Sequence, residues 1–382
     1  MKTIYFDYNA TTPLDPQVRE AMLPYLGEVW GNPSSVHHVG RKARSCLDDL
    51  RDRTATFLGA KPSEVVFTSG GTESVNLAIF GTARLLKPKG RHLITSAVEH
   101  HAVLHACEYL AKKEGFELTG LPVDSTGRVS VASLEKALRP DTLLVSIQAA
   151  NNEIGTLQPV AELGALCRSK GVLFHTDAVQ CFGKEPFVSI HQFNADLVSI
   201  CAHKFHGPKG AGALFIKSPL LPDPVFFGGS HENERRAGTE NLPAIAGMVE
   251  ALLRFVKVPV FDKTLLAPLT SRLIQLVDSL PGVHFVGSRE QRLTNTVSFL
   301  VERADSITLL AGLDLEGICA SSGSACSAGS LNPSHVVSAL GLDKNLANSL
   351  VRFSIGKNST QEEVESVIKV LPGLIRRVQA AQ

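Results

Sequence analysis

The sequence has no excess of charge and no long apolar run. Its 382 residues carry 38 lysines and arginines against 37 aspartates and glutamates, a formal net charge of +1. This balance gives no reason to expect nucleic acid or an anionic membrane surface as a partner. No segment approaches the roughly 20 apolar residues that cross a bilayer. The start of the chain, MKTIYFDYNATTPLD, lacks the apolar core of a signal peptide. These absences predict a cytoplasmic location.

A regular cysteine framework is missing too. There is no C-x-x-C pair, and the seven cysteines are scattered at positions 46, 107, 167, 181, 201, 319 and 326. Most should be reduced, and several lie in apolar runs, where a free cysteine is a small hydrophobic residue. Cys326 differs because it lies within SSGSACSAGS (321–330), a run of small and polar residues. We expect an exposed and mobile thiol there.

The chain is long enough for two domains. Hydrophobic residues make up 44% of its 382 residues, and this length makes two domains the default. Up to Asn241, apolar runs of strand length alternate with helical patterns, which favours a mainly parallel sheet covered by helices. Longer amphipathic helices follow. We place the boundary near residue 257, with a large domain over 15–257 and a small α+β domain over 1–14 and 258–382.

The patterns predict individual elements. Residues 1–14 are interpreted as a short polar segment that ends in a loop. The expected strands are 64–68, 92–96, 143–149, 172–176, 196–200, 295–301 and 351–355. The expected helices are 16–26, 40–58, 72–86, 103–114, 160–170, 242–256, 265–280 and a last helix that begins at a capping box, Thr360 with Glu363, and runs to Val378.

A lysine near the middle of the chain follows a buried strand. The apolar run 196–200 is followed by His203 and Lys204 and then by the tight turn GPKG (207–210). Partial desolvation lowers the pKa of an amine and frees its lone pair for attack on a carbonyl. We therefore interpret Lys204 as the lysine that binds pyridoxal phosphate as a Schiff base. A surface lysine beside a glycine turn is the alternative.

Two other segments could complete such a site. TSGGTE (68–73) places backbone N–H groups and the Thr72 hydroxyl at the start of a helix, which suits a single phosphate. Its spacing matches neither glycine-rich nucleotide motif. Asp177 ends a buried strand, where parallel-sheet proteins bind ligands, and a carboxylate there can keep a pyridine nitrogen protonated. An ordinary strand–helix turn and a turn-capping aspartate are the alternatives.

Histidines and asparagines follow two further strand ends. His100 offers a flat ring that could stack on a cofactor. His101 and His105 have the i, i+4 spacing of a zinc site, but no H-E-x-x-H and no third ligand is near them in the sequence, so we predict no resident metal. NNEIG (151–155) is interpreted either as an active-site loop or as a plain turn.

Ten segments of the chain match one known family in order and spacing: DYNATTPLDP, GNPSSVH, FTSGGTES, VEHHAVL, NNEIGTLQP, HTDAVQ, AHKFHGPKGAGALF, GGSHENERRAGTEN, SSGSAC and VRFSIG. On these segments the chain resembles the cysteine desulfurases of the NifS/IscS type, within the class V aminotransferases. SSGSAC followed by SAGSLNPSHV is similar to the branch with a long cysteine loop. The resemblance implies a pyridoxal-phosphate-dependent transferase of fold type I, an α/β fold with a mainly parallel seven-stranded sheet between helices and a smaller α+β domain.

The resemblance also implies which residues bind the cofactor. Lys204 would hold it covalently, and Asp177 would contact its pyridine nitrogen. Gln180 would donate to its ring oxygen, and His100 would stack on its ring. The other expected contacts are Gly71, Thr72, Asn151, Cys201, His203 and Thr239. Thr239 would reach the phosphate from a second subunit, which implies a homodimer.

The same resemblance implies the reaction. Asn32, Asn151 and Arg352 would surround L-cysteine, whose carboxylate a guanidinium can bind with two hydrogen bonds. Cys326 would receive the sulfur as a persulfide and leave L-alanine. Together with Lys204 and His100, it forms the expected catalytic set. The persulfide would pass to an acceptor protein, such as an iron–sulfur scaffold, and Cys326 can contact an iron–sulfur cluster during that transfer.

One position departs from the family pattern. Cys201 stands where the family usually has serine, two residues before the histidine of the His-Lys pair. A thiol is a weak donor, so we expect Cys201 to line the pocket while the phosphate is bound more loosely or backbone groups compensate. Selenocysteine cleavage, another pyridoxal phosphate reaction and, least favoured, a non-catalytic scaffold are the alternative functions. The sequence does not distinguish cluster assembly, nitrogenase maturation and tRNA thiolation as its purpose.

Overall fold

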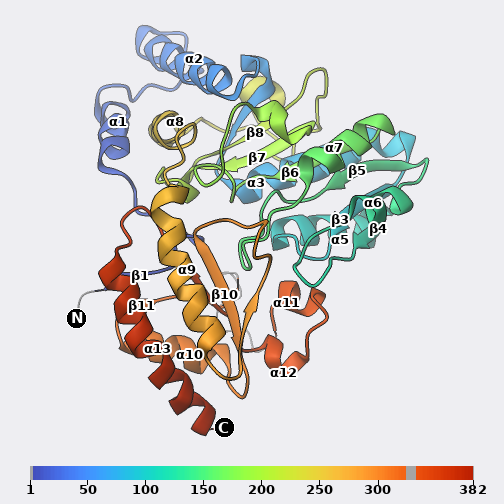
Figure 1. Ribbon diagram of the computed structural model, residues 1–382. Coiled ribbons are helices and arrows are strands. Elements are labelled where there is room, and N and C mark those ends of the chain that lie inside the picture. Colours follow the sequence, from blue (N-terminus) through green and yellow to red (C-terminus); the bar gives the residue numbers. More distant parts are fainter. Residues whose placement is uncertain (1–2, 324–332, 382) are drawn as a thin grey trace.

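A seven-stranded sheet forms the centre of the larger part of the molecule (Figure 1). The computed structural model describes residues 3–323 and 333–381, so Cys326 lies outside the described residues. In this sheet β8 runs antiparallel to both neighbours and the other pairs are parallel, which confirms the predicted mainly parallel sheet. In spatial order the strands are β2 (Val65–Thr68), β8 (Gly212–Ile216), β7 (Leu197–Cys201), β6 (Leu173–Asp177), β5 (Thr142–Ser146), β3 (His92–Ser96) and β4 (Glu117–Leu121).

Helices cover both faces of this sheet, and each face has its own core. Neighbouring residues of a strand point to opposite faces, so in β3 Leu93 packs into the core beneath α3 and α5 while Ile94 packs into the core beneath α2, α7 and α8. Leu50 of α2 is one of the side chains that close the second core. The helices of this part are α1 (Pro16–Gly27), α2 (His38–Leu58), α3 (Gly71–Asn76), α5 (His101–Glu114), α6 (Val131–Ala137), α7 (Val160–Ser169) and α8 (Leu242–Phe255).

The predicted helix over 72–86 is divided. A π-helical stretch, Leu77–Gly81, separates α3 from α4 (Thr82–Leu86). At its end, Gly81 packs against the carbonyl group of Asp223, and a Cβ at Gly81 would lie 2.5 Å from that oxygen. Glycine therefore permits a contact between two backbones that the helical pattern of the sequence does not reveal.

The rest of the chain builds a smaller sheet with its own core. The antiparallel order is β12 (Val351–Ser354), β10 (Thr296–Val301) and β9 (Val283–Val286). The accompanying helices are α9 (Lys263–Ser279), α10 (Ser306–Leu315), α11 (His335–Ala339), α12 (Lys344–Ala347) and α13 (Gln361–Ala381). Figure 1 shows α9 and α13 beside this sheet. The division at residue 257 stays a prediction. Among the described residues, no helix has the length and apolar character needed to cross a membrane.

The beginning of the chain differs from the polar segment that we predicted. β1 (Ile4–Tyr5) pairs in parallel with β11 (Ile318–Cys319), and Ile4, Phe6 and Tyr8 belong to the core of the smaller part. The run is too short to show a clear period, and its partners lie about 300 residues away along the chain. The segment continues to the larger sheet, where Thr12 N–H donates to the carbonyl of His203 at 3.0 Å. It therefore joins the small sheet to the loop after β7.

Candidate active site

One cavity of about 230 Å³ lies where the carboxyl ends of β6 and β7, the start of α5 and the N-terminal segment meet. Parallel-sheet proteins bind their ligands at this edge. Most of the predicted site residues line it, namely Gly71, Thr72, His100, Asp177, Gln180, Cys201, His203, Lys204 and Arg352. Asn9, Gln148 and Asn152 also line it and were not predicted.

Lys204 enters the cavity from the short helical turn after β7 (Ala202–Lys204). Its Nζ donates to two carbonyl oxygens of the N-terminal segment, that of Asn9 at 2.7 Å and that of Ala10 at 2.8 Å. Burial lowers the pKa of the Lys204 amine to about 8. A usable share of the amine is therefore neutral close to neutral pH, as a nucleophile or a base requires.

Asp177 lies at the carboxyl end of β6 and also faces this cavity. Burial raises the pKa of its carboxyl group to about 6, although the positive charge of Lys204 and the hydrogen bond from Val179 N–H (3.0 Å) act in the opposite direction. A buried carboxylate with a single backbone donor still needs a partner. A protonated ring nitrogen would supply one.

His100 caps the start of α5, where its Nδ1 accepts a hydrogen bond from Ala102 N–H at 3.1 Å. Burial, with the nearby charge of Lys204, lowers the pKa of His100 to about 4. The imidazole is therefore neutral at pH 7, and because Nδ1 is the acceptor, its proton is on Nε2. The ring of His100, expected from the sequence to stack on a cofactor, is thus uncharged and lines this cavity.

The turn between β2 and α3 forms another wall of the cavity. A Cβ at Gly212 would lie 2.7 Å from the Cα of Gly70, so these two backbones meet only because residue 212 is glycine. This places Gly71 and Thr72 at the cavity. His203 lies there too, with its pKa lowered by burial to about 4.

Cys201 lines the same cavity. It is buried, and its Sγ is 3.9 Å from the carbonyl oxygen of Ala211, a weak hydrogen bond. Burial raises the pKa of the Cys201 thiol. The side chain is therefore an uncharged wall and a poor donor.

Arg352, on β12, is the cation that the small sheet contributes. Its side chain is 1% exposed and forms an ion pair with Asp7 at 2.6 Å. Its Nη1 donates to the carbonyl oxygens of Asn152 at 2.9 Å and Gly323 at 2.8 Å. Its Nε has no hydrogen-bond partner among the described residues. A permanently charged fork thus faces the cavity from the side opposite the large sheet.

Three of the predicted residues that the structure describes do not line this cavity. Asn151 is buried, and its amide accepts from Glu153 N–H in its own loop and donates to the Val98 carbonyl in the segment after β3. Asn32 is exposed and its Oδ1 accepts from Ser34 N–H. Thr239 lines a separate depression. Cys326 lies outside the described residues.

Asn9 is the contact that sequence reasoning missed. Its backbone oxygen accepts from both Lys204 and Gln180, and its side chain is buried. Only a short run of small polar residues before Pro13 marks the position in the sequence. The partners are more than 170 residues away along the chain, so no local pattern could have shown the contact.

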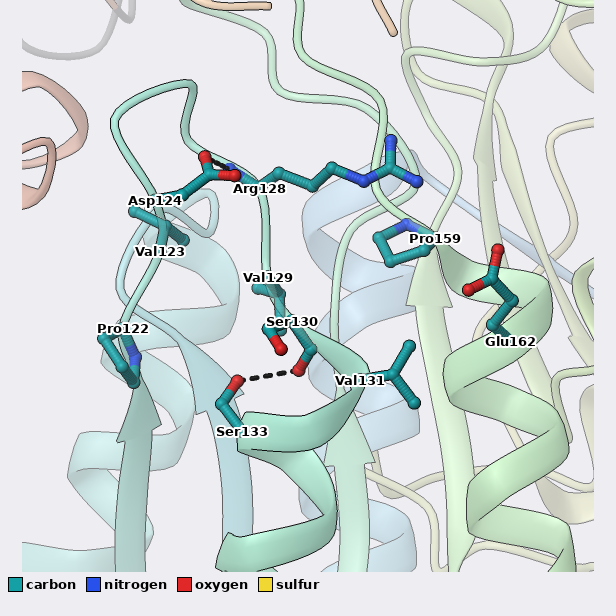
Figure 2. A pocket seen from close by; sticks show the side chains of 10 residues that line it. All are labelled: Pro122, Val123, Asp124, Arg128, Val129, Ser130, Val131, Ser133, Pro159 and Glu162. Atoms are coloured by element: carbon teal, nitrogen blue, oxygen red, sulfur yellow. Dashed lines mark hydrogen bonds between the residues drawn. The ribbon is translucent and has the colours of Figure 1, made fainter.

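Figure 2 shows a second pocket, of about 480 Å³, past the end of β4 and beside the starts of α6 and α7. Ser133 donates to the carbonyl of Ser130 there, and the Arg128 side chain extends toward Pro159. None of the predicted site residues lines it. We therefore locate the chemistry in the cavity that contains Lys204.

Comparison with known proteins gives a consistent family. Residues 4–367 match the Aminotransferase class-V family. The cysteine desulfurase IscS of Dictyoglomus turgidum is 46% identical over 380 residues, 99% of this chain and 95% of that protein. A solved NifS-like protein aligns with a TM-score of 0.89 at 36% identity, over 100% of this chain and 99% of its own. SspA in complex with cysteine aligns with a TM-score of 0.82 at 34% identity, over 94% and 100%.

Proposed function

We propose a role for each residue of this cavity, on the premise that the chain belongs to the Aminotransferase class-V family and, within it, to the cysteine desulfurases. This family depends on pyridoxal phosphate, and the similarity to the NifS-like structure confirms the predicted fold type I. The chain is accordingly an enzyme that takes sulfur from L-cysteine and leaves L-alanine. The meeting of Lys204 and Asp177 at one cavity is the observation that carries this conclusion.

The residues present fit pyridoxal phosphate. Lys204 provides an amine of lowered pKa, and Asp177 is a buried carboxylate that lacks a strong donor. His100 provides a neutral ring, and Thr72 with His203 provides polar groups for a phosphate. When bound, pyridoxal phosphate supplies an electron sink for the pair released at the substrate Cα.

Proton handling falls to residues of the large sheet. Lys204 takes the proton from the substrate Cα and returns a proton later, a task that suits an amine with a pKa of about 8. Asp177 keeps the proton on the ring nitrogen. Arg352 binds the substrate carboxylate, and its partner Asp7 keeps the guanidinium in place.

The sulfur passes to Cys326. Its thiolate attacks the sulfur of the substrate, an S–S bond forms, and the Cβ–S bond breaks with its electron pair going to Cβ. Cβ takes up a proton, and the products are L-alanine and a persulfide on Cys326. Gly323, the last described residue before this cysteine, supports the role because its carbonyl is 2.8 Å from Arg352 Nη1, which lies at the cavity. An acceptor protein, such as an iron–sulfur scaffold, then removes the persulfide.

The homodimer and the cytoplasmic location also belong to this proposal. Thr239 is exposed and lies apart from the cavity of its own chain, as expected of a residue that serves a second subunit. The six described cysteines are free thiols, as is usual in a reducing compartment.

The test is product formation without an external thiol. Protein loaded with pyridoxal phosphate is mixed with L-cysteine, and alanine and protein-bound persulfide are measured. We expect both from the native chain and from Cys46→Ser, which changes a cysteine far from the site. Cys326→Ser should form no persulfide and little alanine. Unchanged turnover in Cys326→Ser would contradict the role of that thiol, and no alanine from the native chain would contradict the whole proposal.

A further inference from the structure

Lys184 is a buried lysine that the proposed reaction does not use. It is 5% exposed and lies in the turn that follows β6. Its Nζ donates to Asn9 Oδ1 at 2.6 Å and to Gln180 Oε1, and it lies 5.1 Å from the centre of the Phe261 ring. In the part of the chain that the structure describes, these partners include no carboxylate. An amine is rarely buried in this way without a task.

The Lys184 amine determines the orientation of the Gln180 side-chain amide. An ammonium group only donates hydrogen bonds, so the atom of Gln180 that faces it must be the oxygen. The Nε2 group of Gln180 is thereby turned away from Lys184, and it donates to the Asn9 carbonyl at 3.0 Å. An NH2 group has two donors, so one remains for the cavity, which Gln180 lines.

The protonation state of Lys184 does not alter this arrangement. Burial lowers the pKa of Lys184 well below its usual value; Lys204 and Arg352 act in the same direction, and Cys181 and Glu185 oppose it. A neutral amine still has two N–H donors, enough for the two amide oxygens that it contacts. The Asn9 carbonyl, which accepts from Gln180 Nε2, therefore keeps the Gln180 oxygen toward Lys184 in both states.

The Asn9 carbonyl closes the network. It accepts from Gln180 Nε2 and also from Lys204 Nζ at 2.7 Å. If the Gln180 amide rotated by half a turn, its oxygen would face that carbonyl, and two acceptors would repel each other. Lys184 and Asn9 thus favour the same orientation from opposite sides.

We propose that Lys184 is a positioning residue of the reaction, which holds the Gln180 amide with its NH2 group toward the cavity, where that group donates to the ring oxygen of pyridoxal phosphate. This inference rests on the function proposed above. A donor at that oxygen stabilises its anionic form, and a carbonyl oxygen in the same place would destabilise it. Lys184 therefore acts on the chemistry through Gln180 without touching the substrate.

The test follows the absorbance of the bound cofactor as a function of pH, which reports on the ring oxygen without turnover. Gln180→Leu removes the donor and should raise the midpoint of the absorbance transition by about one pH unit, the value of one hydrogen bond to a charged group. Lys184→Met should raise it in the same direction because the amide can then rotate. The double variant should show no larger shift than Gln180→Leu alone, since the two residues act as one unit.

Two control variants separate positioning from stability. Val277→Ala, in the core of the small sheet, should lower the melting temperature and leave the midpoint unchanged. Lys184→Arg keeps the donors and should keep the native midpoint wherever it folds. If Lys184→Met does not fold, Lys184→Gln takes its place, because a neutral amide can no longer impose one orientation on Gln180.

The outcomes distinguish the two proposals. No shift in Gln180→Leu would contradict the cofactor contact and with it the proposed function of Gln180. A shift in Gln180→Leu without one in the Lys184 variant would overturn the role of Lys184 alone. Additive shifts in the double variant would also overturn it, because they would mean that Lys184 acts by a separate route.

Discussion

The ionisable groups on the two sides of the cavity differ in whether their charge is compensated by an ion pair. On the side of the large sheet, burial moves the pKa values of Asp177, Lys204 and His100 to about 6, 8 and 4, each toward the neutral form. On the side of the small sheet, Arg352 is 1% exposed and is paired with Asp7 at 2.6 Å. Lys204, which must exchange a proton, donates only to backbone carbonyls, and Arg352, which must stay charged, is paired with a carboxylate.

Among the variants considered, Lys204→Ala should cause the largest loss of activity. It removes both the amine that holds the cofactor and the base, so we expect a loss of alanine formation of at least about a thousandfold, within the range attributed to general bases. Alanine release under saturating L-cysteine measures it. Lys209→Ala, in the exposed turn five residues later, should keep native activity. A residual rate in Lys204→Ala within tenfold of the native rate would contradict the assignment.

Asp177→Asn keeps the shape of the same wall and removes its charge. An amide cannot hold a proton on the ring nitrogen, so kcat should fall by about a hundredfold or more, as for other preorganised electrostatic groups. The spectrum of the bound cofactor should change with it. Asp196→Asn is the matched control. Asp196 lies immediately before β7, its carboxylate accepts from Phe174 N–H, and it does not line the cavity. Equal losses in the two variants would indicate a folding defect instead.

Arg352→Lys tests the paired side. The charge that balances Asp7 remains, but the fork that can bind a carboxylate with two hydrogen bonds is lost. We expect KM for L-cysteine to rise by about ten- to a hundredfold, the value of one charged hydrogen bond, with a smaller change in kcat. Steady-state kinetics measure both. A fall in kcat with KM unchanged would mean that Arg352 belongs to the chemistry and not to binding, and the contrast between the two sides would fail.

How much the sequence could predict depends on how far apart along the chain the interacting residues lie. The strand predicted over 92–96 is β3 to the residue, and Asp177 and Lys204 lie at strand ends as expected, because apolar runs and turns are local signals. β4 was missed because it is partly exposed and contains Gly120. α6 was missed because it is short and buries only Leu134.

The missed parts of the site depend on distant contacts. Lys184 is preceded by glycine and followed by glutamate and proline, which in sequence resembles an exposed turn. Only its contacts with Asn9 and Phe261 bury it. Asn9 and Tyr8 likewise obtain their roles from the small sheet, through Ser354 on β12. A pattern in one segment cannot show which other segment will cover it.

The stability of the cofactor-free protein against pH offers a weaker test of the same contrast. His206 is buried, and burial lowers its pKa to about 4. The histidines 100, 175 and 203 are also lowered, so the unfolded chain binds more protons than the folded one between about pH 4 and pH 6.5. The free energy of unfolding should therefore rise with pH across that range. The raised pKa values of Asp177, Glu99 and Glu185 oppose this, since they favour the folded state at low pH, but they are three groups against the four histidines.

His206→Asn isolates one of these contributions. His206 has a φ of 66°, a left-handed conformation that asparagine tolerates. The variant should reduce the slope of unfolding free energy against pH by at most about 1.4 kcal/mol per pH unit, the contribution of one proton. Urea denaturation between pH 4.5 and pH 7.5 measures the slope. An unchanged slope would mean that burial of this ring does not exclude its proton.

Cys201→Ser makes the smallest change, adding a donor to the sheet side without adding charge. A hydroxyl donates more strongly than a thiol, whose Sγ lies 3.9 Å from the Ala211 oxygen. We expect pyridoxal phosphate to bind about fivefold more tightly, the value of one neutral hydrogen bond. Cofactor dissociation at equilibrium measures it, and Cys167→Ser in α7 should lower stability without altering that affinity. Unchanged or weaker binding in Cys201→Ser would contradict this prediction. It would mean that the backbone N–H groups beside Gly71 already satisfy the phosphate, so that a stronger donor at position 201 adds nothing.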